Sequence, residues 1–310
     1  MLKYIGKRLL YMIPVILGIS FILFLIMDLT PGDPARVLLG EYASQEEVDQ
    51  LREEMGLNDN FFVRYARYVA SAVQGDFGDS YRSKTPVVDE IQARFPTTMK
   101  LAFFAVLLSV VIGIPVGIIS AVKQYSFADI LSMTSALLFT SIPAFWLGLM
   151  LILVFAVQLH WFPAVGSDSW KSFILPGIAL AAQQMATLIR MTRSTMLEVI
   201  RQDYVRTAKA KGATPSQVIM HHSLQNALLP VVTAVGLSFS NLLGGALIIE
   251  NVFGISGLGS LMVDAVKGKD SPMLIASVMF AALVGGLVNL AVDILYTYID
   301  PRVKSQYVKG

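Results

Sequence analysis

The chain has 310 residues, of which 55% are hydrophobic and only 15% are charged. A soluble domain usually carries about 25% charged residues, so this composition indicates a membrane protein and argues against an ordinary soluble domain. The net charge of +2 is too small to indicate nucleic-acid binding, and the absence of cysteine excludes disulfides, thiolate zinc sites and a cysteine nucleophile.

The first apolar run follows a basic start at Lys3, Lys7 and Arg8. Such a start is shared by cleaved signal peptides and by uncleaved anchors. The apolar part is long, and Leu29-Thr30-Pro31 lacks the small residues of a cleavage site. We therefore interpret residues 1–29 as a cytoplasmic N-terminus followed by the first transmembrane helix.

Residues 30–98 form the one sizeable polar segment, which we expect outside the cytoplasm. Ser44 is a helix N-cap and Gly56 ends that helix, and further helices are predicted at 61–73 and 87–95. The segment is too small to be an independent catalytic domain. We interpret it as a cap packed on the outer ends of the spans, and a docking surface for an external protein is a compatible alternative.

Six apolar runs are long enough to cross a membrane, which requires about 20 apolar residues in a helix. The fourth run is the shortest and most polar, so it meets this requirement least well. The sequence predicts an all-α integral membrane protein with six transmembrane helices. The runs cover residues 9–29, 99–122, 130–159, 173–191, 227–249 and 273–299.

A water-facing helical hairpin is predicted at residues 203–229, between the fourth and fifth spans. We expect Asp203 to cap its first helix, and Gly212 to end that helix because glycine adopts the left-handed conformation at low cost. Thr214, with Gln217 three residues later, predicts a second helix start. Such a hairpin is suited to contact a cytoplasmic partner.

Lysine and arginine gather on three segments that six spans place on one side of the membrane. The positive-inside rule makes this side cytoplasmic, so both termini and the hairpin are expected there. Residues 99–310 then form a five-helix core that carries the hairpin. The basic residues are Lys3, Lys7, Arg8, Arg190, Arg193, Arg201, Arg206, Lys209, Lys211, Arg302, Lys304 and Lys309.

Short motifs occur in a fixed order along the chain. They are Pro31-Gly32-Asp33-Pro34, Gly75-Asp76-Phe77-Gly78 with Ser80 and Pro86, Arg190-Met191-Thr192-Arg193-Ser194, Asp203-Tyr204-Val205-Arg206-Thr207-Ala208, Ala210-Lys211-Gly212, Asn226-Ala227, Leu229-Pro230-Val231-Val232-Thr233, Gly257-Leu258-Gly259, Asn289-Leu290, Val292-Asp293, Leu295-Tyr296 and Asp300-Pro301-Arg302. On a six-span topology, this ordered set resembles the permease subunit of bacterial ATP-binding-cassette (ABC) importers. The resemblance is to the dipeptide, oligopeptide, glutathione and nickel group of binding-protein-dependent transport inner-membrane components, and it covers essentially the whole chain.

The resemblance implies that the hairpin is the cytoplasmic segment that couples the permease to an ATPase. The family pattern is Glu-Ala-Ala, three residues, Gly, whereas this chain has Arg206, Thr207, Ala208 and then Gly212. The contact would therefore rest on shape and positive charge. The residues expected to couple are Asp203, Tyr204, Arg206, Thr207, Ala208, Lys211 and Gly212.

The chain has no Gly-x-x-x-x-Gly-Lys-Ser/Thr loop to hold nucleotide phosphates, so we expect no enzyme activity and no cofactor of its own. The resemblance implies two separate ATP-binding subunits that hold ATP and Mg²⁺. It also implies a second homologous permease subunit and an extracytoplasmic substrate-binding protein. The resulting heteromeric complex would lie in the bilayer of the bacterial cytoplasmic (inner) membrane, without nucleic acid.

The cargo implied by the resemblance is a dipeptide, an oligopeptide or a glutathione-like peptide, with nickel or a metal chelate as the alternative. The short outer segment 161–172 favours the glutathione-like or oligopeptide branches. Polar residues inside apolar spans are candidates for the transport pathway, and an interhelical hydrogen bond is a strong alternative explanation for each. The pathway candidates are Gln183, Gln184, Ser238 and Asn241.

Two rival classes are an integral-membrane enzyme and an ion-driven carrier. No nucleophile, base and orienting residue are brought together by the linear pattern, so no catalytic residue is assigned. The histidines are His160, His221 and His222, and two adjacent residues on one helix point about 100° apart, so no metal site is predicted. A carrier commonly shows internal repeats, and the sequence has no clear repeat.

Overall fold

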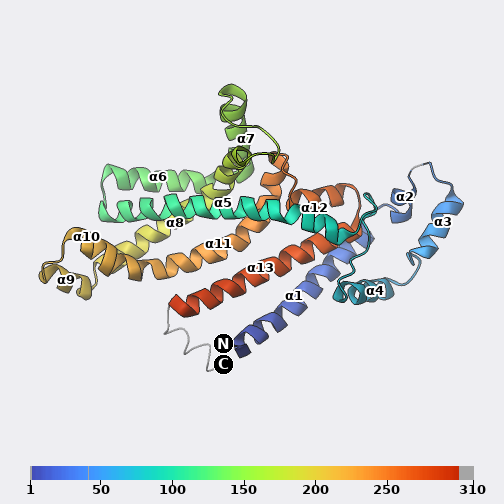
Figure 1. Cartoon of the computed structure of the whole chain (residues 1–310), viewed down its shortest axis with the longest axis horizontal. Helices are drawn as coiled ribbons and strands as arrows, with labels where there is room; N and C mark the ends of the chain where they lie inside the picture. Colours follow the sequence, from blue (N-terminus) through green and yellow to red (C-terminus); the bar gives the residue numbers. More distant parts are fainter. Residues whose placement is uncertain (1, 41, 300–310) are drawn as a thin grey trace. The chain divides into compact units, whose positions relative to one another are not determined.

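The computed structural model describes residues 2–40 and 42–299, and within them it contains helices and no strand. The predicted motif Asp300-Pro301-Arg302 and the basic residues Lys304 and Lys309 lie outside the described residues. The elements in chain order are α1 (Leu2–Leu29), α2 (Pro34–Leu39), α3 (Gln45–Glu54), α4 (Phe61–Val73), α5 (Val87–Val122), α6 (Phe127–Ser141), α7 (Ala144–Leu151), η1 (Ile152–Gln158), η2 (Trp170–Phe173), α8 (Ile174–Ile200), α9 (Asp203–Ala210), α10 (Pro215–Gln217), η3 (Val218–Ser223), α11 (Leu224–Val252), α12 (Leu258–Lys267) and α13 (Ser271–Ile299) (Figure 1).

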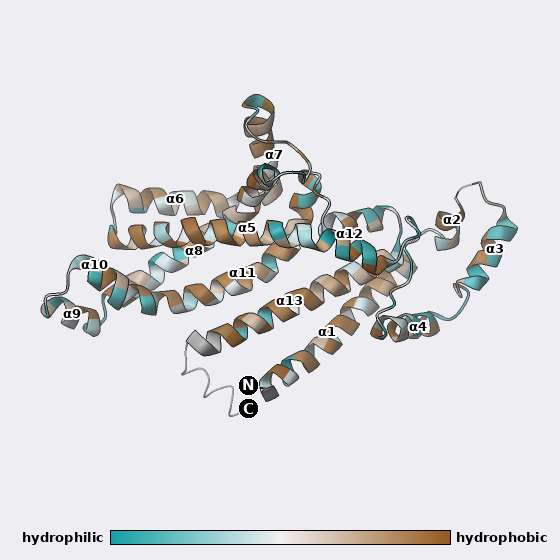
Figure 2. Ribbon diagram, viewed as in Figure 1, coloured by the Kyte–Doolittle hydropathy of each residue, from teal (hydrophilic) through white to brown (hydrophobic). Residues whose placement is uncertain are grey.

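Five described helices are long and apolar enough to cross a membrane, and a bent helix pair makes a sixth span if it is counted as one. The predicted all-helical membrane fold is confirmed. The five spans are Tyr4–Leu29, Val87–Val122, Trp170–Ile200, Pro230–Val252 and Ser271–Leu295. Figure 2 shows the apolar character of α1, α5 and α13 and the hydrophilic character of α3.

The third predicted span, residues 130–159, is not one straight helix. It consists of α6 followed by α7 and η1, and the two parts are bent by 103°. The break falls at Ile142 and Pro143, where Ile142 adopts extended backbone angles (φ −86°, ψ 124°). A residue before proline is pushed out of the helical region and proline has no N–H to continue the ladder, which explains the break. Upstream, the helix expected at 87–95 is continuous with the second span in α5.

The described chain divides into two compact units. The larger unit contains residues 99–255 and 287–299, and the smaller unit contains residues 2–98 and 256–286. Within the larger unit, α8 packs against α6, α7 and α11. Its most apolar window is 61% buried, against 33% or less in the other four spans. The run that looks least suited to lipid is therefore the one that is most enclosed by protein.

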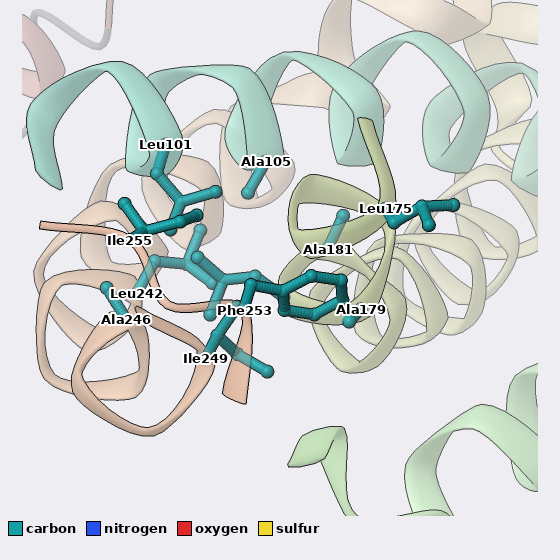
Figure 3. Packing of buried hydrophobic residues seen from close by; sticks show 11 residues of the cluster. Leu101, Ala105, Leu175, Ala179, Ala181, Leu242, Ala246, Ile249, Phe253 and Ile255 are labelled. Atoms are coloured by element: carbon teal, nitrogen blue, oxygen red, sulfur yellow. The ribbon is translucent and has the colours of Figure 1, made fainter. Parts of the chain in front are cut away.

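The core of the larger unit joins three long helices. Figure 3 shows Leu101 and Ala105 from α5, Leu175 from α8 and Phe253 beyond the end of α11 packed in one buried cluster. Small residues on α8 allow the close approach, and a Cβ added to Gly177 would lie 2.3 Å from the ring of Phe104. Helix association in membranes commonly relies on such small residues.

The smaller unit ties the polar segment to α1. Phe24 of α1 makes edge contacts with Phe61 and Tyr65 of α4, and Arg64 forms an ion pair with Asp28. The predicted N-cap Ser44 is confirmed and forms a capping box, because Glu47 accepts from the Ser44 N–H at 2.8 Å while its own N–H donates to the Ser44 hydroxyl at 3.3 Å. These contacts are those of a folded layer rather than a free tail.

Replacing Gly117 on α5 by leucine tests the packing of α8. A Cβ at this position would lie 2.6 Å from the Thr192 Cβ and 2.8 Å from the Ile189 carbonyl oxygen, so α5 must move away from α8. Overpacking of this kind costs about 1–3 kcal/mol, and we expect a lower Tm in thermal unfolding of the detergent-solubilised protein. Gly244→Ala on α11, whose added Cβ meets nothing within 4 Å, is the control and should not lower the Tm. An unchanged Tm for Gly117→Leu would contradict the close approach of these helices.

Candidate functional site

The predicted hairpin is present in the larger unit as α9, α10 and η3. Gln202 occupies the N-cap of α9 and makes no side-chain cap bond, so the assignment of Asp203 as N-cap is wrong by one position. Asp203 is the first helical residue, and its 99% exposed side chain lies 3.8 Å from the Arg206 guanidinium. Its carboxylate still lies at the positive end of the helix dipole.

The turn between the helices has the predicted chemistry. Gly212 has a φ of +87°, and its N–H donates to the Lys209 carbonyl at 3.0 Å. The Ala213 N–H donates to the Ala208 carbonyl at 3.2 Å. These two bonds form a Schellman motif, which satisfies carbonyls at the end of α9. The left-handed glycine expected at this position is confirmed.

The second helix starts with a capping box. The Thr214 N–H donates to Gln217 Oε1 at 2.9 Å, and the Gln217 N–H donates to Thr214 Oγ1 at 3.3 Å. The chain then passes through the π-helical segment η3 into α11. Val205 of α9 and Val218 of η3 are buried, and Asn226 donates to the Tyr204 hydroxyl at 3.0 Å. The hairpin is thus a compact unit held by its own hydrogen bonds.

A hollow of about 430 Å³ lies between α9 and the η3 segment. Five of the seven predicted coupling residues line it, whereas Asp203 and Arg206 do not. The face shared by Ala208 and Gly212 is therefore concave. The lining residues are Tyr204, Thr207, Ala208, Lys211, Gly212, Ala213, Gln217 and His222.

Three lining residues, Ala213, Gln217 and His222, are absent from the predicted set. Gln217 is visible in the sequence as half of a capping box, and its amide also faces the hollow. His222 lines the hollow because the wide π-helical turn of η3 changes the angular position of the residues after Val218, and the sequence pattern does not reveal such a turn. Lys211 lines the hollow and gives its rim a positive charge, and Arg206 and Lys209 are exposed elsewhere on α9.

The pathway candidates do not share one environment. Gln183 and Asn241 are exposed in the single chain, whereas Ser238 is buried and donates to the Ala234 carbonyl of its own helix. Gln184 is partly buried, and its side-chain nitrogen has no hydrogen-bond partner within the described residues. A buried amide without a partner is costly, so Gln184 is the candidate with the clearest unmet need for a polar contact.

A larger hollow of about 650 Å³ lies in the smaller unit and is lined by charged residues of α1, α3 and α4. Its guanidinium groups are already paired, since Arg52 lies 2.9 Å from Asp33 and Arg64 contacts Asp28. Burial, assisted by nearby Asp270, raises the pKa of Tyr81 to about 12 and keeps its hydroxyl neutral. These pairs hold the segment together, and we assign no ligand to this hollow.

The fold and the site define a multi-pass, all-helical membrane protein with an exposed helical hairpin between two spans. Residues 113–305 match the family described as binding-protein-dependent transport system inner membrane component, and residues 1–102 match the N-terminal region of that family. The chain belongs to this family, and it is a bacterial inner-membrane protein.

Curated relatives match along nearly the whole chain. The glutathione transport system permease protein GsiC of Escherichia coli strain K12 is 43% identical over 304 residues, covering 98% of this chain and 99% of the relative. The dipeptide transport system permease protein DppB of Alkalihalophilus pseudofirmus is 42% identical over 332 residues, covering 98% and 100%.

Solved structures share the fold at low sequence identity. An inward-facing structure of the MetNI methionine ABC transporter has a TM-score of 0.58 at 21% identity and covers 68% of this chain and 96% of that chain. An amino acid ABC transporter crystallised with histidines has a TM-score of 0.53 at 16% identity and covers 69% and 94%. These likenesses concern the fold alone.

Removing the cap at Thr214 tests the local order of the hairpin. Thr214→Ala deletes the hydroxyl that accepts the Gln217 N–H, and loss of such a cap costs about 1 kcal/mol. We expect amide hydrogen exchange in residues 216–219 to accelerate about fivefold. Ser216→Ala, at an exposed position two residues away, is the matched control and should leave exchange unchanged. Equal exchange rates in both variants would show that the capping box does not order this turn.

Proposed function

We propose that this chain is a permease subunit of an ATP-driven, binding-protein-dependent importer that carries glutathione-like or other short peptides across the inner membrane. Family membership over most of the chain supports the role of permease. The single structural observation that supports ATP coupling is the compact, exposed hairpin with its concave, basic-rimmed face.

Peptide cargo is supported by the relatives, which are named as glutathione and dipeptide permeases. The alignment with the glutathione permease is shorter than this chain, whereas the alignment with the dipeptide permease, at 332 residues, exceeds the 310 residues of the chain and must contain gaps opposite it. The closer match in length favours the glutathione-like branch. Nickel or a metal chelate, the alternative cargo, is not favoured by either relative.

The machinery proposed around this chain follows from what the chain lacks. It has no phosphate-binding loop, so ATP and Mg²⁺ would be held by two separate ATP-binding subunits. A second homologous permease would complete the pathway, and an extracytoplasmic binding protein would deliver the peptide. The hairpin and both termini would face the cytoplasm, where the positive-inside rule places their lysine and arginine residues.

The hairpin is proposed as the contact with one ATP-binding subunit. Tyr204, Ala208 and Gly212 would shape the hollow for an apolar partner side chain, and Lys211 would pair with an acidic group at its rim. Arg206, which is exposed on another face of α9, would pair with acidic groups outside the hollow. Asp203 would stabilise α9 itself through its negative charge at the positive end of the helix dipole. Thr207, whose hydroxyl donates to the Asp203 carbonyl at 2.9 Å, would line the hollow. A movement of the ATP-binding subunits would then be passed to the ends of α8 and α11, which the hairpin joins.

Filling the hollow tests the coupling role. Ala208→Leu places a larger side chain in the lining without changing the turn at Gly212, and we expect peptide uptake by the reconstituted complex to fall about tenfold or more while ATP hydrolysis continues. Ala210→Leu, two residues along α9 and exposed, is the matched control because its side chain points about 200° away. Uptake and ATP hydrolysis that stay linked in Ala208→Leu would contradict the assignment of the hairpin.

Stimulation of ATP hydrolysis tests the cargo. In the complete complex with its binding protein, we expect glutathione or a short peptide to raise the ATPase rate, and we expect Ni²⁺ to leave it unchanged. The measurement is the ATPase rate against cargo concentration, with binding protein omitted as the control. Stimulation by Ni²⁺ and not by peptides would replace the peptide assignment by the metal alternative.

A further inference from the structure

One buried carboxylate in the larger unit joins three helices. Asp129, in the first turn of α6, is 3% exposed, and both of its oxygens accept from Arg193 of α8, at 2.7 Å from Nε and 2.8 Å from Nη2. The Ser120 hydroxyl of α5 donates to the same carboxylate at 2.5 Å, and the Tyr125 N–H donates at 2.9 Å. Helices α5 and α8 and the turn between α5 and α6 are therefore bonded to this one side chain.

An ion pair between a buried carboxylate and an arginine whose side chain is 22% exposed is poorly explained by stability alone. Taking two charges out of water offsets much of their attraction, and well-packed apolar residues of similar volume often stabilise a fold as well or better. Removing one partner, by contrast, leaves an uncompensated charge and is strongly destabilising. A bidentate Arg–carboxylate pair also fixes direction, because the planar guanidinium fits the two oxygens in one orientation. Asp129 and Arg193 thus hold α6 and α8 in one register.

The ion pair lies at the same end of the larger unit as the hairpin. Arg193 is seven residues before the end of α8 at Ile200, and α9 begins at Asp203. Further along α8 toward the hairpin there is a buried cluster of Ala121 of α5, Met196 of α8 and Ala227 of α11. Ile219 of η3 packs against this cluster. Figure 1 shows α9 and α10 at the end of α8 and α11 where α5 turns into α6. Packed side chains therefore connect the ion pair with the base of the hairpin, where α8 ends and α11 begins.

From this end, α6 leads to the 103° bend that precedes α7. Ala136 of α6 is buried against Ala186 and Ile189 of α8, so the two helices stay in contact beyond the ion pair. Past the bend, Gly148 of α7 packs against Phe253, where an added Cβ would lie 3.0 Å from the ring. A displacement of α6 would reach the far end of the unit through this bent pair.

We infer that Asp129 and Arg193 are a positioning pair that makes α6 move together with the coupling hairpin. Together with Ser120, the ion pair joins α6 to the C-terminal part of α8. A displacement of α9 is therefore transmitted to the bent helix pair and is not lost through relative movement of α6 and α8. The inference rests on the proposed function, because it assumes that the hairpin receives the push.

The first test measures ATP consumed per peptide imported by the complete complex in proteoliposomes. Asp129→Asn keeps the size of the side chain and removes its charge, and we expect the ratio to rise about fivefold or more at equal amounts of assembled complex, with ATP hydrolysis retained. The double variant Asp129→Arg with Arg193→Asp should recover part of the coupling. Arg190→Gln, exposed one turn earlier on α8, is the control and should keep the wild-type ratio. A wild-type ratio in Asp129→Asn would overturn the inference.

The second test measures whether α6 moves relative to the hairpin when the ion pair is intact and when it is removed. The chain has no cysteine, so spin labels can be placed at Thr134→Cys on α6 and Met220→Cys on η3, both exposed. In the complete complex we expect ATP to leave the distance between these labels unchanged, and we expect a change when Asp129→Asn is added. A change on ATP with the pair intact, or none without it, would overturn the inference.

The two proposals fail in different ways. If Ala208→Leu leaves uptake linked to ATP hydrolysis, the hairpin is not the coupling contact, whatever the labels show. If Ala208→Leu uncouples the complex while Asp129→Asn does not, the hairpin assignment stands and the positioning pair is wrong.

Discussion

Close packing of small residues along α8 is the constraint on which the larger unit depends. Lipid tails give helices little hydrophobic reason to associate, so contact relies on backbones that approach closely. Ala179, Ala181 and Ala186 of α8 are buried completely or almost so, and Gly117 of α5 leaves no room for a Cβ beside Thr192. The places of α5, α6 and α11 follow from this packing. The ends of those helices then determine the positions of the ion pair and of the base of the hairpin.

Local features of this fold could be predicted from the sequence, because their hydrogen bonds close within a few residues. The box of Thr214 with Gln217, the box of Ser44 and the left-handed Gly212 are of this kind. Long-range features could not. Hydropathy measures the tendency of a segment to enter lipid. The span that contains α8 has the lowest hydropathy of the five spans, although it is the one most enclosed by protein. The apolar run through Pro143 likewise does not show in which direction the chain turns.

The candidate site shows the same division. Five predicted coupling residues line one hollow, because their helical spacing places them on one face. The concave form of that face depends on how α9 packs against the π-helical segment, which only tertiary structure reveals. Asp129 lies one residue before an apolar run, so a search for apolar runs does not mark it, and the sequence does not show that Arg193 is its partner. The Ser126 N-cap, three residues before Asp129, was the available signal for a helix start there.

We propose that the chemistry takes place in partner subunits and that this chain transmits the resulting movement. ATP hydrolysis by the partner subunits would then drive peptide import through this permease. The most direct measurement is uptake of a labelled peptide by proteoliposomes that hold the complete complex and its binding protein, with ATP or an ion gradient supplied separately. We expect uptake with ATP on the hairpin side and without any ion gradient. Uptake driven by an ion gradient in the absence of ATP would contradict it.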